Sequence, residues 1–176
     1  MNKYPRLYLP RKLYYLLHPV ILNWHVSNAE YVYKGKDTPV SLTYTPPNTA
    51  QISLVDSAIV SSTLTEWARL ARQLGMEPWI VYMPCKRRVL DGYVRFHPNV
   101  KKTLINWAPT DLPDFIGKIA NRTGMGFVDL TGPLVDETRQ GRLTFNSVTD
   151  THLNRHGSVI VAQAIISALK RSRVIR

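Results

Sequence analysis

The feature that most constrains the fold is an alternation of amphipathic helices and short apolar strands between residues 56 and 130. After Asp56, a predicted N-cap, and before Gly75, a predicted helix stop, one helical stripe is apolar and contains Val60, Leu64, Trp67, Ala68, Ala71 and Leu74. A strand is predicted from Trp79, a second helix over 110–122 with its stop at Gly124, and a second strand from Phe127. Such alternation predicts a parallel sheet with helices on its faces.

An apolar run over 158–169 predicts one more helix, buried on most of its circumference. Between Val159 and Leu169 only Gln163 and Ser167 are polar, and with Lys170 they form one narrow stripe. Sites in doubly wound sheets gather at the carboxyl ends of the strands. We therefore expect residues 84–86, 131–132 and 150–152 to lie near one another.

Directly before this helix the chain reads Thr-Asp-Thr-His-Leu-Asn-Arg-His-Gly over residues 149–157. In an extended segment or tight turn, Asp150 and His152 leave the same side of the backbone, and the carboxylate can accept a hydrogen bond from one ring nitrogen. The other nitrogen can then take a proton, as in a hydrolytic or acyl-transfer site. The alternative interpretation is structural: Asp150 caps the helix and His152 packs.

Three blocks together resemble the SGNH/GDSL-type hydrolases, in particular their alginate and other polysaccharide O-acetyltransferase branch. They are the Asp-x-His block at 150–157, the strand at 79–86 that ends in Pro-x-Lys, and the strand at 126–130. The similarity covers roughly residues 56–169. It implies a flavodoxin-like three-layer α/β/α parallel sheet and a serine esterase or O-acyltransferase acting on an ester or acylated carbohydrate. By resemblance, His152 is the base and Asp150 orients it.

One departure from the family stands out. Such enzymes carry their nucleophile in a Gly-Asp-Ser block, and this sequence contains none. The residues present resemble the second half of the domain, so we expect an incomplete sheet with an unpaired edge at Trp79. That edge predicts a marginal fold, self-association, or dependence on an upstream segment that completes the sheet. The chain alone is expected to be nearly inactive.

Other residues compete for roles at such a site. Ser57 follows Asp56 but lacks the glycines of a nucleophile turn, which makes it a weak nucleophile candidate. Cys85 follows a predicted strand and reads more readily as structural than as a reactive thiol. Lys86 is a candidate for contacting an anionic substrate, with a solvated surface cation as the alternative. His152 and His156 with Asp150 make a poor metal set, and we expect no metal and no cofactor.

Composition indicates one folded domain over residues 1–176, with an irregular lead-in to residue 55 and an α/β core over 56–176. The chain has 23 basic and 12 acidic residues and a net charge of +11, which favours anionic partners without choosing among them. Its basic clusters, among them 86–88, lack the interleaved aromatic residues of a base-stacking surface, so a solvated face is expected and nucleic acid is disfavoured. Two alternatives to an enzyme stay open: a non-catalytic module that binds an acidic glycan or protein partner, and a nucleic-acid binder.

The sequence leaves the compartment open. A single cysteine excludes an intrachain disulfide and a multi-cysteine zinc site, and it fits the cytosol without forbidding the periplasm. No signal-peptide pattern is present, and the longest apolar stretch, 13–26, is interrupted by polar residues and Pro19. A longer natural N-terminus would leave room for a signal or an anchor.

Overall fold

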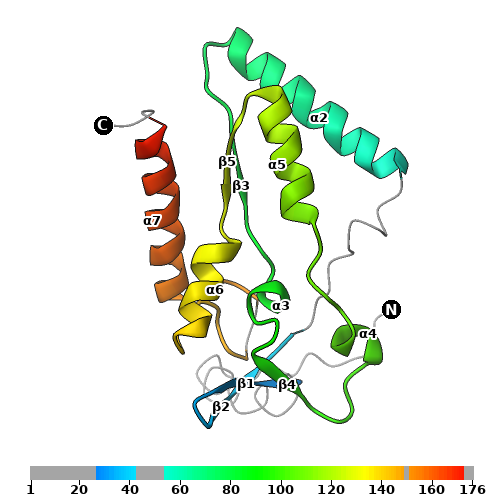
Figure 1. The fold of residues 1–176 in the computed structure, drawn as a ribbon, viewed down its shortest axis with the longest axis vertical. Coiled ribbons are helices and arrows are strands. Elements are labelled where there is room, and N and C mark those ends of the chain that lie inside the picture. The colour runs from blue at the N-terminus through cyan, green and yellow to red at the C-terminus, as the bar shows by residue number, and fades with distance from the viewer. Residues whose placement is uncertain (1–26, 43–53, 149–150, 173–176) are drawn as a thin grey trace, which may run out of the picture.

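The computed structural model describes residues 27–42, 54–148 and 151–172, and its central layer is a pair of parallel strands. β3 (Trp79–Tyr82) pairs with β5 (Gly126–Asp129) in a register that matches Trp79 with Gly126 and Tyr82 with Asp129. On one face lie α2 (Leu54–Gln73) and α5 (Leu112–Thr123), and on the other lie α6 (Thr131–Arg139) and α7 (Arg155–Arg171) (Figure 1). The mixed α/β class is therefore confirmed.

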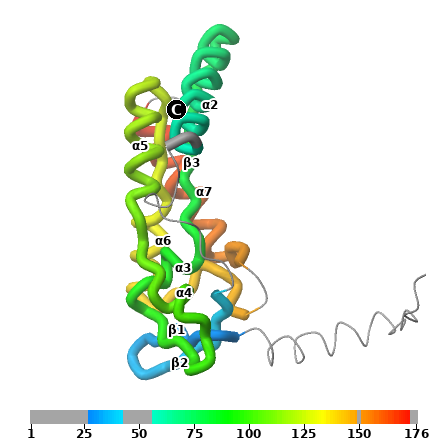
Figure 2. The backbone as a smooth tube through the Cα atoms, turned by 90° about the vertical axis from the view of Figure 1, so that its right-hand side faces the viewer, coloured from blue at the N-terminus to red at the C-terminus, as the bar shows by residue number. Residues whose placement is uncertain are grey.

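A second, antiparallel sheet forms one end of the molecule, beyond the short helices α3 (Lys86–Val89) and α4 (Lys102–Ile105) (Figure 2). Its strand order is β2-β1-β4, with β1 (Ala29–Tyr33), β2 (Lys36–Val40) and β4 (Val94–Phe96). The sequence predicted only an irregular lead-in up to residue 55 and not this sheet, because β4 has only three residues and pairs with a strand some sixty positions earlier.

In the described residues the parallel sheet has two strands. It is narrower than the parallel sheet of the three-layer α/β/α fold that the resemblance implies. The amides of Gly126 and Leu130 donate to the carbonyl oxygens of Pro78 and Tyr82, at 3.0 and 3.1 Å. Because alternate peptide groups of a strand point in opposite directions, those of Trp79 and Val81 face the other edge of β3. No strand of the described ranges pairs there, so the edge expected at Trp79 is open in this part of the chain.

The predicted carboxyl ends of α2 and α5 hold, whereas the amino ends differ: α5 starts at Leu112, not 110, and α7 starts at Arg155, not 158. Gly75 and Gly124 follow α2 and α5 with φ of 70° and 64°, and the left-handed conformation suits glycine at a helix stop. α2, however, starts at Leu54, so Asp56 lies in the first helical turn and is not the N-cap. A carboxylate in that turn still interacts favourably with the helix dipole.

The prediction that α7 is buried on most of its circumference is wrong for the described chain. Val159 and Ile166 are 47% and 46% exposed, because α7 packs on β5 and α6 along one face only. On α2, Trp67 and Leu70 are likewise exposed, at 42% and 44%. The apolar faces of both helices are thus wider than the two strands can cover. No helix of the described segments is both long enough and apolar enough to span a bilayer.

Candidate active site

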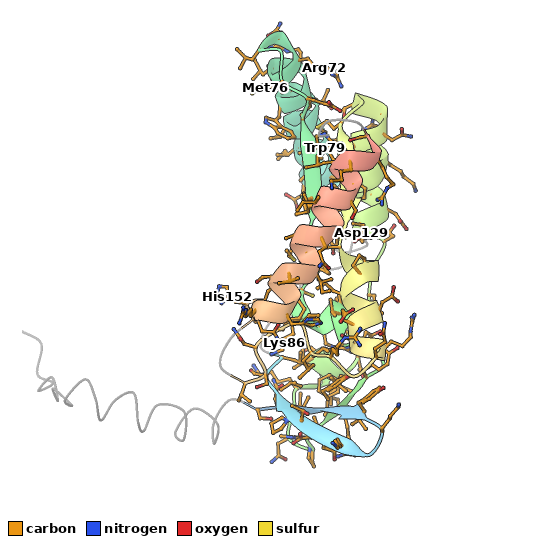
Figure 3. The ribbon with its side chains drawn as sticks, turned by 90° about the vertical axis from the view of Figure 1, so that its left-hand side faces the viewer. Arg72, Met76, Trp79, Lys86, Asp129 and His152 are labelled. Atoms are coloured by element: carbon orange, nitrogen blue, oxygen red, sulfur yellow. The ribbon has the colours of Figure 1, made fainter. Side chains whose placement is uncertain are left out.

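A cavity of about 620 Å³ lies at the carboxyl end of β3 and has His152 on its rim. One wall comes from the segment that follows the strand and the other from the segment that leads into α7; the lining residues are Leu42, Met83, Pro84, Cys85, Lys86, Arg87, Phe145, Thr151, His152, Leu153 and Ser158. His152 and Lys86 lie at the same end of the sheet, far from Trp79 (Figure 3). Residues 84–86 and 151–152 thus line the same cavity, as the sequence predicted. Asp150 lies outside the described residues.

His152 is carried by a short hairpin-like loop. Phe145 and Leu153 form an isolated antiparallel bridge, and the Asn146 amide donates to the His152 carbonyl oxygen at 3.0 Å. Leu153 packs against the buried cluster that contains Phe145 and Leu134, which anchors the residue after the histidine. The main chain of His152 is therefore fixed while its side chain is exposed toward solvent and the cavity.

Asn154 and Gly157, both within the Asp-x-His block at 150–157, hold this loop against α7. The Asn154 side chain accepts a hydrogen bond from the Gly157 amide at 2.8 Å and is the N-cap of α7. Its Nδ2 donates to the carbonyl oxygens of Leu143 and Phe145, at 2.8 and 3.2 Å. A Cβ at position 157 would lie 2.0 Å from the Thr144 carbonyl oxygen, so only glycine allows this approach. An asparagine before an apolar helix is a recognisable N-cap signal, which the sequence analysis did not use.

The basic cluster 86–88 is buried, so the expected solvated face is wrong here. Lys86, Arg87 and Arg88 are 3%, 4% and 9% exposed. The Lys86 ammonium donates to the carbonyl oxygens of Asn146 and Ser147, and the guanidinium groups of Arg87 and Arg88 donate to those of Trp107 and Thr110. Lys86 thus fixes the 146–147 segment to α3, whereas Arg87 and Arg88 both fix the connection between α4 and α5. Runs of charged residues are usually solvated. In this sequence, only the apolar residues around α3 indicate that the run is buried.

The remaining nucleophile candidates differ in their distance from the cavity and in their reactivity. Cys85 lines it, but burial raises the pKa of its thiol, which disfavours the reactive thiolate. Ser57 lies in the first turn of α2 and is not a lining residue. Ser158 does line the cavity, yet its hydroxyl donates to the Asn154 carbonyl oxygen at 3.0 Å within the first turn of α7. The described residues therefore supply no serine in an evident attacking pose.

His156 belongs to a different cluster from His152. Its Nε2 lies 2.6 Å from a Glu137 carboxylate oxygen on α6, and Arg142 donates to the same carboxylate. The Arg142 guanidinium, aided by His156 and opposed by burial, lowers the pKa of Glu137 to about 2. Within residues 27–42, 54–148 and 151–172 no group of three histidine, cysteine or acidic side chains is placed to hold a metal ion.

Comparison with known proteins supports the fold alone. No protein-family model matches this chain. No curated protein matches it either. Among solved structures it is similar to the O-acetyltransferase domain of Pseudomonas putida AlgJ, with a TM-score of 0.56 and 21% identity over 76% of this chain. The matched part spans 44% of that domain, so the chain corresponds to less than half of it. The chain therefore shares the fold of that domain over the matched part, whereas membership of the SGNH/GDSL-type family and of its branch stays a prediction.

Proposed function

We propose that this chain carries the base half of an acyl-transfer site, of the serine esterase or O-acetyltransferase type. The observation that carries the proposal is the cavity at the carboxyl end of β3, with His152 fixed on its rim by both the Phe145–Leu153 bridge and the Asn146 amide. His152 would accept the proton of an attacking hydroxyl, and Asp150, two residues earlier, would orient the imidazole. The fold likeness to an O-acetyltransferase domain supports the same class of chemistry.

The proposed reaction has two steps. A serine hydroxyl attacks the ester carbonyl as His152 takes its proton, and the imidazolium then protonates the departing alcohol, which leaves an acyl-enzyme. Water or a sugar hydroxyl attacks that ester, again with His152 as the base, which releases acid or acylated carbohydrate and restores the serine. Because the sequence has no Gly-Asp-Ser block, we propose that the serine and the oxyanion donors come from a further segment.

Hydrolysis of p-nitrophenyl acetate by the purified chain tests the proposal. Without a serine, an oriented imidazole still assists attack by water, so we expect slow release of nitrophenol that falls roughly 100-fold in His152→Ala, the lower end of the range for a positioned general base. His156→Ala is the matched control, since that ring binds Glu137 and does not line the cavity. Equal rates for wild type and His152→Ala would contradict the function. Fast turnover abolished by His152→Ala would place a nucleophile within these residues.

A non-catalytic module that binds an acidic glycan is the second proposal, favoured by the net charge of +11. It predicts binding to an acidic polysaccharide that weakens as salt rises and is indifferent to substitution of His152. Nucleic-acid binding rests on the charge alone, and the absence of a gel shift at low salt would remove it.

A further inference from the structure

We propose that Lys86 is a positioning residue that holds the His152 loop in place, and not a residue that binds substrate. The proposal rests on the function proposed above, since the loop matters only if His152 is the base. The sequence predicted that Lys86, in the Pro-x-Lys block, contacts an anionic substrate, and this proposal gives it a different role.

Two hydrogen bonds, both made by the main chain of Asn146, connect the Lys86 ammonium to the main chain of His152. Its Nζ lies 2.5 Å from the Asn146 carbonyl oxygen and 2.7 Å from that of Ser147. The amide of the same Asn146 donates to the His152 carbonyl oxygen at 3.0 Å. Asn146 is therefore held on both sides, by Lys86 through its carbonyl and by His152 through its amide.

The second carbonyl joins the loop to the antiparallel sheet. Besides Lys86, the Ser147 oxygen accepts a hydrogen bond from the Ser41 amide at 2.9 Å, directly after β2. Lys86 itself starts α3, two residues after Pro84, at the carboxyl end of β3. The ammonium thus ties together the parallel sheet, the β2 end of the antiparallel sheet and the loop that carries the proposed base.

The burial of Lys86 distinguishes a positioning role from a substrate-binding role. Lys86 is 3% exposed, and the short distances from its Nζ to two carbonyl oxygens are typical of charge-assisted hydrogen bonds. Two of the three ammonium N–H groups donate to these carbonyl oxygens, and a substrate anion would compete with them for a side chain that is almost wholly buried. Lys86 is a lining residue of the cavity, but its ammonium donates to these two carbonyl oxygens.

Neighbouring Arg88 provides a matched control on the same helix. It is also buried, and its guanidinium donates to the Thr110 carbonyl oxygen at 2.6 Å, on a loop that does not carry His152. Lys86→Met and Arg88→Met each remove one buried cation from α3. Only the first removes hydrogen bonds from the His152 loop.

Amide hydrogen exchange of Asn146, followed by NMR, tests the proposal without requiring catalysis. We expect exchange to quicken roughly 10- to 100-fold in Lys86→Met, as follows when a hydrogen bond to a charged group is lost, and to change less than about 3-fold in Arg88→Met. Lys86→Arg, which keeps donors for both carbonyls, should restore much of the protection. If Lys86→Met does not fold, the comparison of Lys86→Arg with Lys86→Gln serves in its place, with Gln faster. Unchanged Asn146 exchange in a folded Lys86→Met or Lys86→Gln protein would overturn the proposal.

Kinetics separate this proposal from the proposed function. A positioning role lowers kcat for nitrophenyl acetate hydrolysis in Lys86→Met and leaves KM unchanged, whereas a substrate-binding role raises KM and leaves Asn146 exchange unchanged. If exchange quickens but His152→Ala retains wild-type activity, the proposed function fails and the positioning role of Lys86 toward the loop stands. If His152→Ala loses activity but Asn146 exchange does not quicken in Lys86→Met, the positioning role of Lys86 fails and the proposed function stands.

Discussion

The imidazole Nε2 of His156 lies 2.6 Å from the Glu137 carboxylate, which joins the first turn of α7 to α6. Arg142 donates to the same carboxylate from the turn after α6. α7 starts three residues after His152. This cluster therefore stabilises the helix that directly follows the proposed base. It is the best-defined ionic feature next to the candidate site.

Stability should fall in acid through Glu137. The pKa of this carboxyl is about 2 in the folded protein, lowered chiefly by Arg142 and further by His156. A group with a lowered folded-state pKa contributes stability above its unfolded value, near 4.5, and loses it as pH falls toward 2. Since Arg142 is partly exposed, we expect on the order of 1–2 kcal/mol to be lost across that window. Urea unfolding at pH 7 and pH 3 measures this, and Glu137→Gln should reduce the difference between the two; an equal difference in the variant would contradict the assignment.

Gly157 should resist any substitution that adds a Cβ. Gly157→Ala would bring a carbon to 2.0 Å from the Thr144 carbonyl oxygen, so helix or loop must shift. We expect a loss of about 1–3 kcal/mol in the free energy of unfolding, the usual cost of overpacking. Gly132→Ala on α6 is the control, since nothing lies within 4 Å of its added Cβ, and it should be neutral or slightly stabilising. Equal effects of the two substitutions in denaturant titrations would show that the Thr144 contact is unimportant.

The open edge of β3 should make the isolated chain associate with itself. Val81 on this strand is 40% exposed, and the apolar residues Val159 and Ile166 of α7 are exposed as well. An unpaired apolar edge is a template for pairing with another chain. We expect sedimentation velocity to show concentration-dependent association that Val81→Lys weakens. Ile105→Lys on α4, equally exposed at 39% but away from the edge, should not. A monomer with a high, cooperative melting transition would contradict this prediction.

Much of the parallel layer is predictable from the sequence because its signals are local. Helical spacing of apolar residues together with Gly75 and Gly124 defines α2 and α5, and short apolar runs define β3 and β5. The antiparallel sheet is not predictable in this way, since β4 is paired by contacts distant in sequence. Periodicity also indicates which face of α7 is apolar but not whether anything covers it, as the exposure of Ile166 demonstrates.

The site was only partly predictable for a related reason. Sequence spacing singled out His152, and the structure places it on the cavity rim beside Lys86. The burial of Lys86 could not be foreseen, because its ammonium donates to backbone carbonyls sixty and sixty-one residues away and any residue type can supply a backbone carbonyl. The functional roles of Asp150, His152 and Ser57 stay predictions.

The central proposal is that the Asp150 carboxylate orients the His152 imidazole so that its other ring nitrogen can accept a proton. The ¹⁵N chemical shifts of the His152 ring report its tautomer directly, since the hydrogen bond made by one nitrogen fixes the state of the other. In the neutral ring we predict a single dominant tautomer in the wild-type chain, and a mixture in Asp150→Asn, with the His156 ring unchanged as an internal control. The same mixture of tautomers in both proteins would contradict the account.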